Sequence, residues 1–198
     1  MSELATAAFA AHTDAHVLEA PRSARFAAFQ AVFDEADYLR KLAARGYRWV
    51  ARSDPAFPHL LRSIHDPPPG LFIRGPAPIA LLERPSVAVV GARACSHYGS
   101  AVAASLAREL TAAGVIVVSG LARGVDGAAH RGALQVGATV AVLGCGIDRD
   151  YPRTHASLAS EVAREGLIVS EYAPGVEPAP WRFPARNRIV AGLTLATS

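Results

Sequence analysis

The sequence has little cysteine, almost no lysine and no long hydrophobic run. Cys95 and Cys145 are the only candidates for a disulfide among 198 residues. They follow the first and third of three expected strands, which lie on either side of the second in a doubly wound sheet. Because that separation is too large for a disulfide, we expect two free thiols and a reducing, cytoplasmic setting.

No apolar run approaches the roughly 18 residues that a membrane-spanning helix needs, and the first residues lack the basic region of a secretory signal. We therefore expect neither a membrane contact nor export. Lysine occurs once among 20 basic residues. Arginine suits bidentate phosphate contacts, but an arginine-rich genome gives the same ratio, so the ratio identifies no ligand.

A repeated strand, glycine turn and helix pattern runs from Pro85 to Cys145. Short apolar runs at 87–90, 115–118 and 139–143 each end in a glycine-containing turn, and helical patterns separate them. Strands this short and apolar are buried on both faces, which indicates a parallel sheet. The fold class that we predict is α/β, a Rossmann-like, doubly wound, mainly parallel sheet. Its glycine turns lie at the carboxyl ends of the strands, where such sheets bind ligands.

We expect three regions. Residues 1–50 form a small helical domain with a helix stop at Gly46, residues 51–84 form a proline-rich connector packed on the sheet, and residues 85–198 form the Rossmann-like domain. The connector contains one short strand, at 70–75. The apolar helix faces of the first region carry Phe26, Phe29, Val32, Phe33, Leu39 and Leu42.

The chain ends shortly after its last predicted helix. A helix over 154–164, a strand over 167–170 and a helix starting near Pro184 complete the pattern. A fifth strand should follow, and we expect none in the last residues. The sheet would then be incomplete, with an open edge and an uncovered underside of the helix at 186–193, and such surfaces favour self-association.

The turn after the first strand predicts a phosphate site. It departs from the G-x-G-x-x-G dinucleotide fingerprint, because Arg93 stands where the second glycine would be after Gly91. Ser96 is placed to cap the next helix, which leaves backbone N–H groups beside a guanidinium. The alternative is that Arg93 pairs with a carboxylate across the loop.

The turn after the second strand, with Gly120 and Arg123, predicts a second anion-binding nest at the start of a helix. Asp126 and His130 lie four residues apart on that helix and can form a hydrogen bond. With no nucleophile beside them, we interpret them as a structural pair, not a catalytic one.

The segment around the last helix is strongly basic. From residue 178 to residue 198 there are three arginines and no acidic residue. Arg186 and Arg188 near a helix N-terminus oppose the helix dipole unless an anion is bound there, and Phe183 offers a ring on which a base can stack. The alternative is a buried Phe183 with arginines that face solvent. Together with the two glycine turns, the segment favours nucleic acid.

Enzymatic residues are sparse. Glu171, at the end of the fourth strand, is the carboxylate best placed to act as a general acid or base, but it has no partner in the pattern. Cys145 lies between two glycines with no histidine nearby in sequence, which favours a small packed residue over a nucleophile. No cofactor or metal motif is present, and we expect no catalysis.

These motifs, taken in order, resemble the DprA (Smf) family of DNA-processing proteins of bacterial transformation. The resemblance extends from about residue 54 to residue 193, and the first region looks like the family's sterile-alpha-motif-like domain. The matching stretches are residues 89–93, 96–99, 119–130, 141–148, 151–152, 170–172 and 183–193.

The resemblance implies a non-enzymatic protein. Members of the family bind single-stranded DNA in a basic pocket of an extended Rossmann sheet, form homodimers and deliver the strand to the recombinase RecA. The early end of this chain weakens the implication of a dimer. The DNA-binding residues that we predict are Gly91, Arg93, Ser96, Gly120, Arg123, Phe183, Arg186, Asn187 and Arg188.

A second class of function stays open at this point. Rossmann-like phosphoribohydrolases, which release a base from a nucleoside monophosphate, have a similar strand pattern. Glu171 would then be the acid or base and Arg93 the phosphate anchor. Their Pro-Gly-Gly-x-Gly-Thr loop is not found in this sequence.

Overall fold

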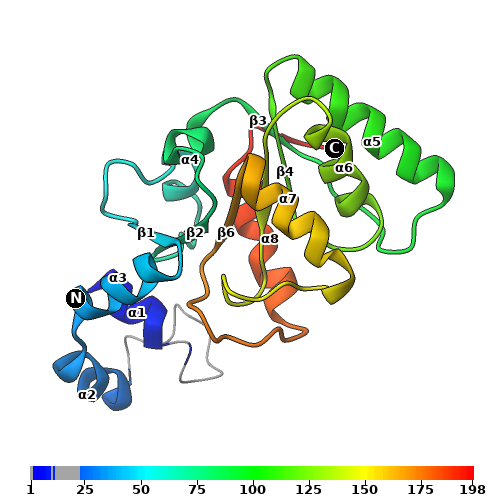
Figure 1. Ribbon diagram of the computed structural model, residues 1–198. Helices are drawn as coiled ribbons and strands as arrows, with labels where there is room; N and C mark the ends of the chain where they lie inside the picture. The colour runs from blue at the N-terminus through cyan, green and yellow to red at the C-terminus, as the bar shows by residue number, and fades with distance from the viewer. Residues whose placement is uncertain (1, 10, 12–22) are drawn as a thin grey trace.

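The computed structural model describes residues 2–9, 11 and 23–198 and forms one mixed sheet with helices on both faces (Figure 1). The strands are β1 (Tyr47–Ala51), β2 (Gly70–Arg74), β3 (Ser86–Ala88), β4 (Ile116–Ser119), β5 (Thr139–Val142), β6 (Leu167–Ser170) and β7 (Ala196–Thr197). The α-helices are α1 (Glu3–Phe9), α2 (Ala24–Val32), α3 (Glu35–Ala44), α4 (His59–Arg62), α5 (His97–Ala112), α6 (Val125–Leu134), α7 (Ala156–Glu165) and α8 (Arg182–Gly192). Two 3₁₀ helices, η3 (Ile79–Glu83) and η4 (Arg153–His155), complete the elements named here.

The sheet order is β1-β2-β6-β5-β4-β3-β7. Strands β6, β5, β4, β3 and β7 run parallel, as predicted for the central strands, while β1 and β2 are antiparallel to their neighbours. Within β4, Ile116 and Val118 pack on one face and Val117 packs on the other. Both faces are therefore buried, which explains why the strand segments are continuously apolar and not alternating.

The helices divide between the two faces of the sheet. Helices α5 and α6 pack against each other and on β4, and α7 packs on β5 and β6. On the opposite face Ile189 and Val190 of α8, and Leu193 just after it, pack into the core beside Leu61 of α4. Both faces of the sheet are thus covered by helices (Figure 1).

Part of the predicted connector lies in the sheet and not on it. The short strand expected at 70–75 is confirmed as β2, but β2 pairs with β6 on one side and with β1 on the other. Gly70 permits this pairing, because a Cβ there would lie 2.3 Å from the Trp49 ring. Trp49 in turn packs on Phe72, with 4.5 Å between ring centroids. Residues 47–50, which we expected to be helical, are strand.

The described part of the first region is helical up to α3. Gly46 adopts a φ of 75° just after that helix, which confirms the predicted stop. Phe26 and Leu42 are buried as expected, whereas Val32 is 81% exposed, so its assignment to a packed face was wrong. Leu39 is also exposed. Residues 10 and 12–22 of the expected helical domain lie outside the described residues.

The expectation of a missing last strand was wrong. β7 pairs with β3 in parallel, and the ladder continues through hydrogen bonds from Ser198 N to Ala88 O and from Val90 N to Ser198 O. The underside of α8 is also covered, since Ile189 is fully buried against α4 and the sheet. A strand of two residues carries too short a pattern to be recognised. The outer edge of β7 pairs with no other strand in the described part of the chain.

Within residues 2–9, 11 and 23–198, no helix combines the length and the apolar character that crossing a membrane requires.

Candidate nucleic-acid interface

Two adjoining hollows lie at the carboxyl ends of β3, β4 and β5, and together we call them the groove. The first hollow has a volume of about 270 Å³ and the second about 290 Å³. The first is lined by Arg93, Gly120, Ala122, Arg123, Leu143, Gly144, Cys145, Tyr151, Pro152, Thr154, Phe183 and Arg186. The second shares four of these residues, Arg93, Gly120, Ala122 and Arg186, and adds Ala88, Val90, Gly91, Asp126, Asn187, Val190, Ala191 and Thr197. The shared residues separate the two hollows.

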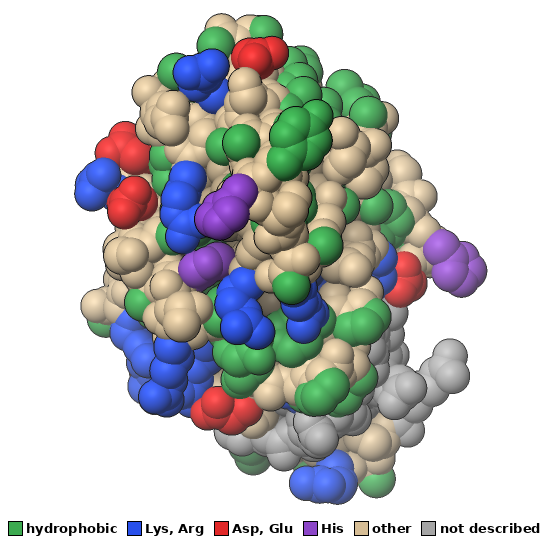
Figure 2. Space-filling view, turned by 90° about the vertical axis from the view of Figure 1, so that its right-hand side faces the viewer, with side chains coloured by type: hydrophobic (Ala, Val, Ile, Leu, Met, Phe, Trp, Pro, Cys, Tyr) green, Lys and Arg blue, Asp and Glu red, His purple; other side chains and the backbone are tan. Residues whose placement is uncertain are grey.

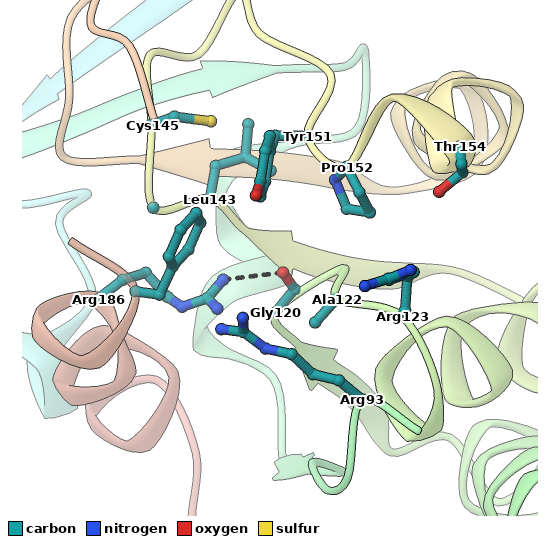
Figure 3. Close-up of a pocket in the computed structure, with 12 residues that line it drawn as sticks. Arg93, Gly120, Ala122, Arg123, Leu143, Cys145, Tyr151, Pro152, Thr154 and Arg186 are labelled. Atoms are coloured by element: carbon teal, nitrogen blue, oxygen red, sulfur yellow. Dashed lines mark hydrogen bonds between the residues drawn. The ribbon is translucent and has the colours of Figure 1, made fainter. Parts of the chain in front are cut away.

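Arg93 extends from the loop after β3 into the groove (Figure 3). The side chain is exposed, and among the described residues no carboxylate lies within 4.0 Å of its guanidinium, so the alternative of an ion pair across the loop fails. Its Cζ atom lies 5.3 Å from the centroid of the Phe183 ring. A cation held over an aromatic face and without a protein counter-ion is available to an anionic ligand.

Ser96 acts as the predicted helix cap. Its hydroxyl accepts a hydrogen bond of 3.1 Å from Gly99 N in the first turn of α5. Ser96 does not line either hollow, so it positions the loop that carries Arg93. Gly91 lines the second hollow and lies against α6, where an added Cβ would be 2.8 Å from Val125 Cγ2.

The loop after β4 is not a free anion nest. Asp126 Oδ2 accepts hydrogen bonds from Gly120 N at 3.0 Å and from Ala122 N at 3.4 Å, so a carboxylate of the chain itself occupies the donors that we assigned to a ligand. Gly120 instead allows close approach, because a Cβ there would lie 2.5 Å from Arg186 Nη2. Arg123 is exposed at the rim of the first hollow.

Asp126 and His130 do not form the predicted pair. His130 Nδ1 lies 2.9 Å from Thr139 Oγ1, which in turn donates to Val117 O, so the histidine ties α6 to β5 and β4. Both residues are buried and structural, as interpreted, but each through a different partner. His130 Nε2 has no hydrogen-bond partner in the described structure.

His130 makes stability depend on pH. Burial first, and then the positive charges of His155, Arg186 and Arg131, lower its pKa from 6.5 to about 3. The unfolded chain therefore takes up a proton below pH 6.5 that the folded chain does not, and stability falls as the pH falls from 6.5 towards 3. We expect His130 to contribute a loss of about 2 kcal/mol in the free energy of unfolding at pH 5.

The measurement is urea unfolding at pH 7.5 and pH 5 of the wild type and of His130→Gln, which has no titrating group at this position. The difference in stability between the two pH values should be smaller in the variant. An equal difference in both proteins would contradict this assignment.

Arg186 is a buried cation at the boundary of the two hollows. Its Nη1 donates to Gly120 O at 2.9 Å (Figure 3) and to Val142 O, which fastens α8 to the ends of β4 and β5. Burial lowers its pKa, an effect that the charge of Asp126 opposes. Its Nε donates to Asn187 Oδ1 at 3.3 Å, and Asn187 lines the second hollow. Arg186 thus supplies a fixed charge that is already held in place by carbonyl groups.

Arg188 is not brought to the groove. Its guanidinium forms two hydrogen bonds with Glu171, of 2.9 and 2.6 Å, and a third of 2.9 Å with Asp66. Burial opposes its charged form, but the hydrogen bonds and charges of Glu171 and Asp66 outweigh burial and raise its pKa. Our prediction of a DNA contact by Arg188 finds no support in this arrangement, which gives the residue a structural role.

An aromatic pair forms one wall of the first hollow. Tyr151 stacks on Phe183 with 5.1 Å between ring centroids and 22° between planes. Phe183 is partly exposed, so neither alternative for it holds in full. Tyr151 was missing from the predicted site, although the Tyr151-Pro152 pair stood among the stretches that carried the resemblance. The sequence signal that could have identified Tyr151 was its position shortly after the glycines that follow the predicted strand at 139–143.

Neither enzymatic candidate is poised for chemistry. Glu171 is fully buried and bound to Arg188 on both oxygens, and it lines neither hollow. Cys145 lines the first hollow, but burial raises the pKa of its thiol to about 12, so it stays protonated near neutral pH. Its role as a small packed residue is the one that the structure supports.

The groove is basic overall. Arg93, Arg123 and Arg186 line it, and its one lining carboxylate, Asp126, is buried and bonded by backbone N–H groups. Figure 2 shows basic side chains gathered in the lower half of one face of the molecule, beside exposed hydrophobic ones. Positive charge next to apolar and aromatic surface suits a ligand that has both phosphates and bases.

Comparison with known proteins identifies the family. A family model described as DNA recombination-mediator protein A matches residues 48–198. DNA processing protein DprA of Streptococcus pneumoniae is 46% identical over 145 residues, which are 71% of this chain and 49% of that protein. Protein Smf of Escherichia coli is 43% identical over 140 residues, which are 70% of this chain and 37% of that protein.

Two solved structures are similar. The X-ray structure of DNA processing protein A from Streptococcus pneumoniae has a TM-score of 0.78 and 34% identity, and the match covers 99% of this chain and 71% of that one. DNA processing protein A from Helicobacter pylori, which binds single-stranded DNA, gives a TM-score of 0.69 and 34% identity over 76% of this chain and 67% of that one.

The chain spans about half the length of the curated relatives that it matches first. The resemblance seen in the sequence is confirmed over most of the chain, in the motifs, in the sheet and in the fold of the solved relatives. The chain belongs to the DNA recombination-mediator protein A family, which includes the proteins called DprA and Smf.

Proposed function

We propose that this protein binds single-stranded DNA in the groove and acts in DNA uptake and recombination without catalysing a reaction. The observation that carries the proposal is Arg93, an exposed arginine in the groove with no carboxylate within 4.0 Å among the described residues, between two hollows and over the face of Phe183. The single-stranded DNA binding of the Helicobacter pylori relative supports it.

The wider role follows from the family. The description of its members as recombination mediators supports delivery of the bound strand to the recombinase RecA in natural transformation, in the cytoplasm. We include a homodimer in the proposal, on the resemblance alone.

The phosphoribohydrolase alternative loses its principal residue. A general acid or base must reach the substrate, whereas Glu171 is fully buried and both its oxygens accept hydrogen bonds from Arg188. Incubation with nucleoside monophosphates should release no free base, and release would restore the enzymatic alternative.

The test of the proposal is binding to oligothymidine. Affinity should fall steeply between about 50 and 200 mM salt, because phosphate contacts release counterions. Arg93→Ala should cost on the order of 1.5–3 kcal/mol in binding, as for a lost hydrogen bond to a charged group. The slope of log affinity against log salt should become shallower by about 0.7, for one phosphate contact on a single strand.

Arg108→Ala is the matched control, since Arg108 is exposed on α5 and lines neither hollow. Thermal unfolding should be unchanged in both variants. Salt-independent affinity in the wild type would contradict the proposal. A lower melting temperature in Arg93→Ala, with affinity retained, would make Arg93 a structural residue.

A further inference from the structure

The two hollows differ in chemistry although they are nearly equal in volume. Tyr151 and Phe183 line the first, whereas the second has no aromatic residue among its described lining residues. The second hollow has the Asn187 amide instead, among aliphatic neighbours such as Val90 and Ala191, beside the arginines that it shares with the first. Each volume lies below the usual range for a drug-sized ligand, which suits a single planar base.

Arg93 and Arg186 line both hollows and so lie between them. Figure 3 shows Arg93 and Arg186 on one side of the first hollow and Tyr151 on the other. Of these two arginines, Arg186 is buried and already donates to Gly120 O and Val142 O, whereas Arg93 is exposed and can bind a phosphate between the hollows. A phosphate bound there would have one hollow on either side.

The aromatic pair determines how a base enters the first hollow. With ring centroids 5.1 Å apart and 22° between planes, Tyr151 and Phe183 are in direct contact, so no base fits between them. Phe183 is also covered by the guanidinium of Arg93. The ring left for stacking is Tyr151, which is 42% exposed.

We propose that the groove binds one dinucleotide step of a single strand, an inference that rests on the proposed function. One base stacks on Tyr151 in the first hollow, the linking phosphate binds Arg93, and the neighbouring base fills the second hollow beside Asn187 and Ala191. A duplex cannot enter in this way, because its bases are stacked and paired. The site therefore selects single strands by requiring two neighbouring bases to separate.

The test uses the dinucleotide TpT and two analogues that lack either the 5′ or the 3′ base, in competition with a fluorescent oligothymidine. Tyr151→Ala should weaken TpT binding about 5- to 150-fold, as expected for loss of base–aromatic stacking. The analogue that lacks the base of the first hollow should bind Tyr151→Ala as tightly as it binds the wild type. Ala191→Leu fills the second hollow from the exposed side of α8. It should weaken the binding of TpT but should not weaken further the binding of the analogue that lacks the base of the second hollow.

Tyr98→Ala is the matched control, because Tyr98 is 80% exposed on α5 and lines neither hollow. Tyr151→Trp should retain binding, and melting temperatures show that each variant folds. TpT binding no tighter than thymidine monophosphate, or both variants behaving like Tyr98→Ala towards TpT, overturns the two-base site while single-strand binding stands. Wild-type protein that binds no oligothymidine overturns the proposed function as well.

Discussion

Replacing Arg188 by methionine is expected to lower the free energy of unfolding by about 3–5 kcal/mol. Glu171 is fully buried, and both its oxygens accept hydrogen bonds from Arg188. Removing the arginine would leave a buried carboxylate without a counter-ion, which is the costly way to break a buried pair. Urea unfolding measures the loss, and affinity for oligothymidine per folded molecule should stay unchanged, because Arg188 lines neither hollow.

Two further variants test the reason for this loss. The double variant Arg188→Met with Glu171→Met should recover most of the stability, because two apolar side chains replace the buried pair. Arg164→Met removes a pair with Glu165 in which the arginine is 69% exposed, and should leave the free energy of unfolding nearly unchanged. Unchanged stability of Arg188→Met together with weaker DNA binding would restore the DNA contact predicted from the sequence.

Gly132→Ala is expected to destabilise the protein by about 3 kcal/mol, although alanine favours an isolated helix by about 1 kcal/mol over glycine. Gly132 lies where α6 crosses α5, and a Cβ there would be 2.1 Å from Ala104 O and 2.7 Å from Ala104 C. Because the obstacle is backbone, the two helices would have to move apart. Thermal and urea unfolding measure the effect.

Gly99→Ala is the matched control in α5. A Cβ at Gly99 would make only ordinary contacts, of 3.5 Å to Cys95 Cβ and 3.5 Å to Ser96 Oγ. That variant should be within about 1 kcal/mol of the wild type. Equal stability of the two glycine variants would show that the crossing of α5 and α6 tolerates separation.

The sequence predicted the central sheet well because its signal is local. Strand runs such as 140–143 and 167–169 are apolar at every position, since both faces of the sheet are covered. The strands that prediction missed are β1 and β7. Each pairs with a strand far away in the chain. With five residues in β1 and two in β7, the hydrophobic pattern of each is too short to reveal that pairing.

The site could be located from the sequence but its charges could not be assigned. The sequence predicted a DNA contact for each of three arginines, Arg93, Arg186 and Arg188. Their different roles depend on the side chains and carbonyl groups that each contacts in the folded protein. Glu171 and Asp66 take up Arg188, while no carboxylate among the described residues reaches Arg93. The occupied donors at Gly120 and the stacking of Tyr151 on Phe183 likewise depend on tertiary contacts.

The strand order has a consequence for how the chain folds. Strands β3 to β6 follow each other through local crossovers, but β2 must pair with β6, joining Phe72 to Ser170, and β3 must pair with β7, joining Val87 to Ala196. Pairings between distant segments form slowly, because the chain loses the entropy of closing a long loop before the stabilising contacts form. Helix α8, which carries Phe183 to the groove, lies in the segment between β6 and β7. We therefore expect the groove to be completed late in folding, after the core of the sheet has formed.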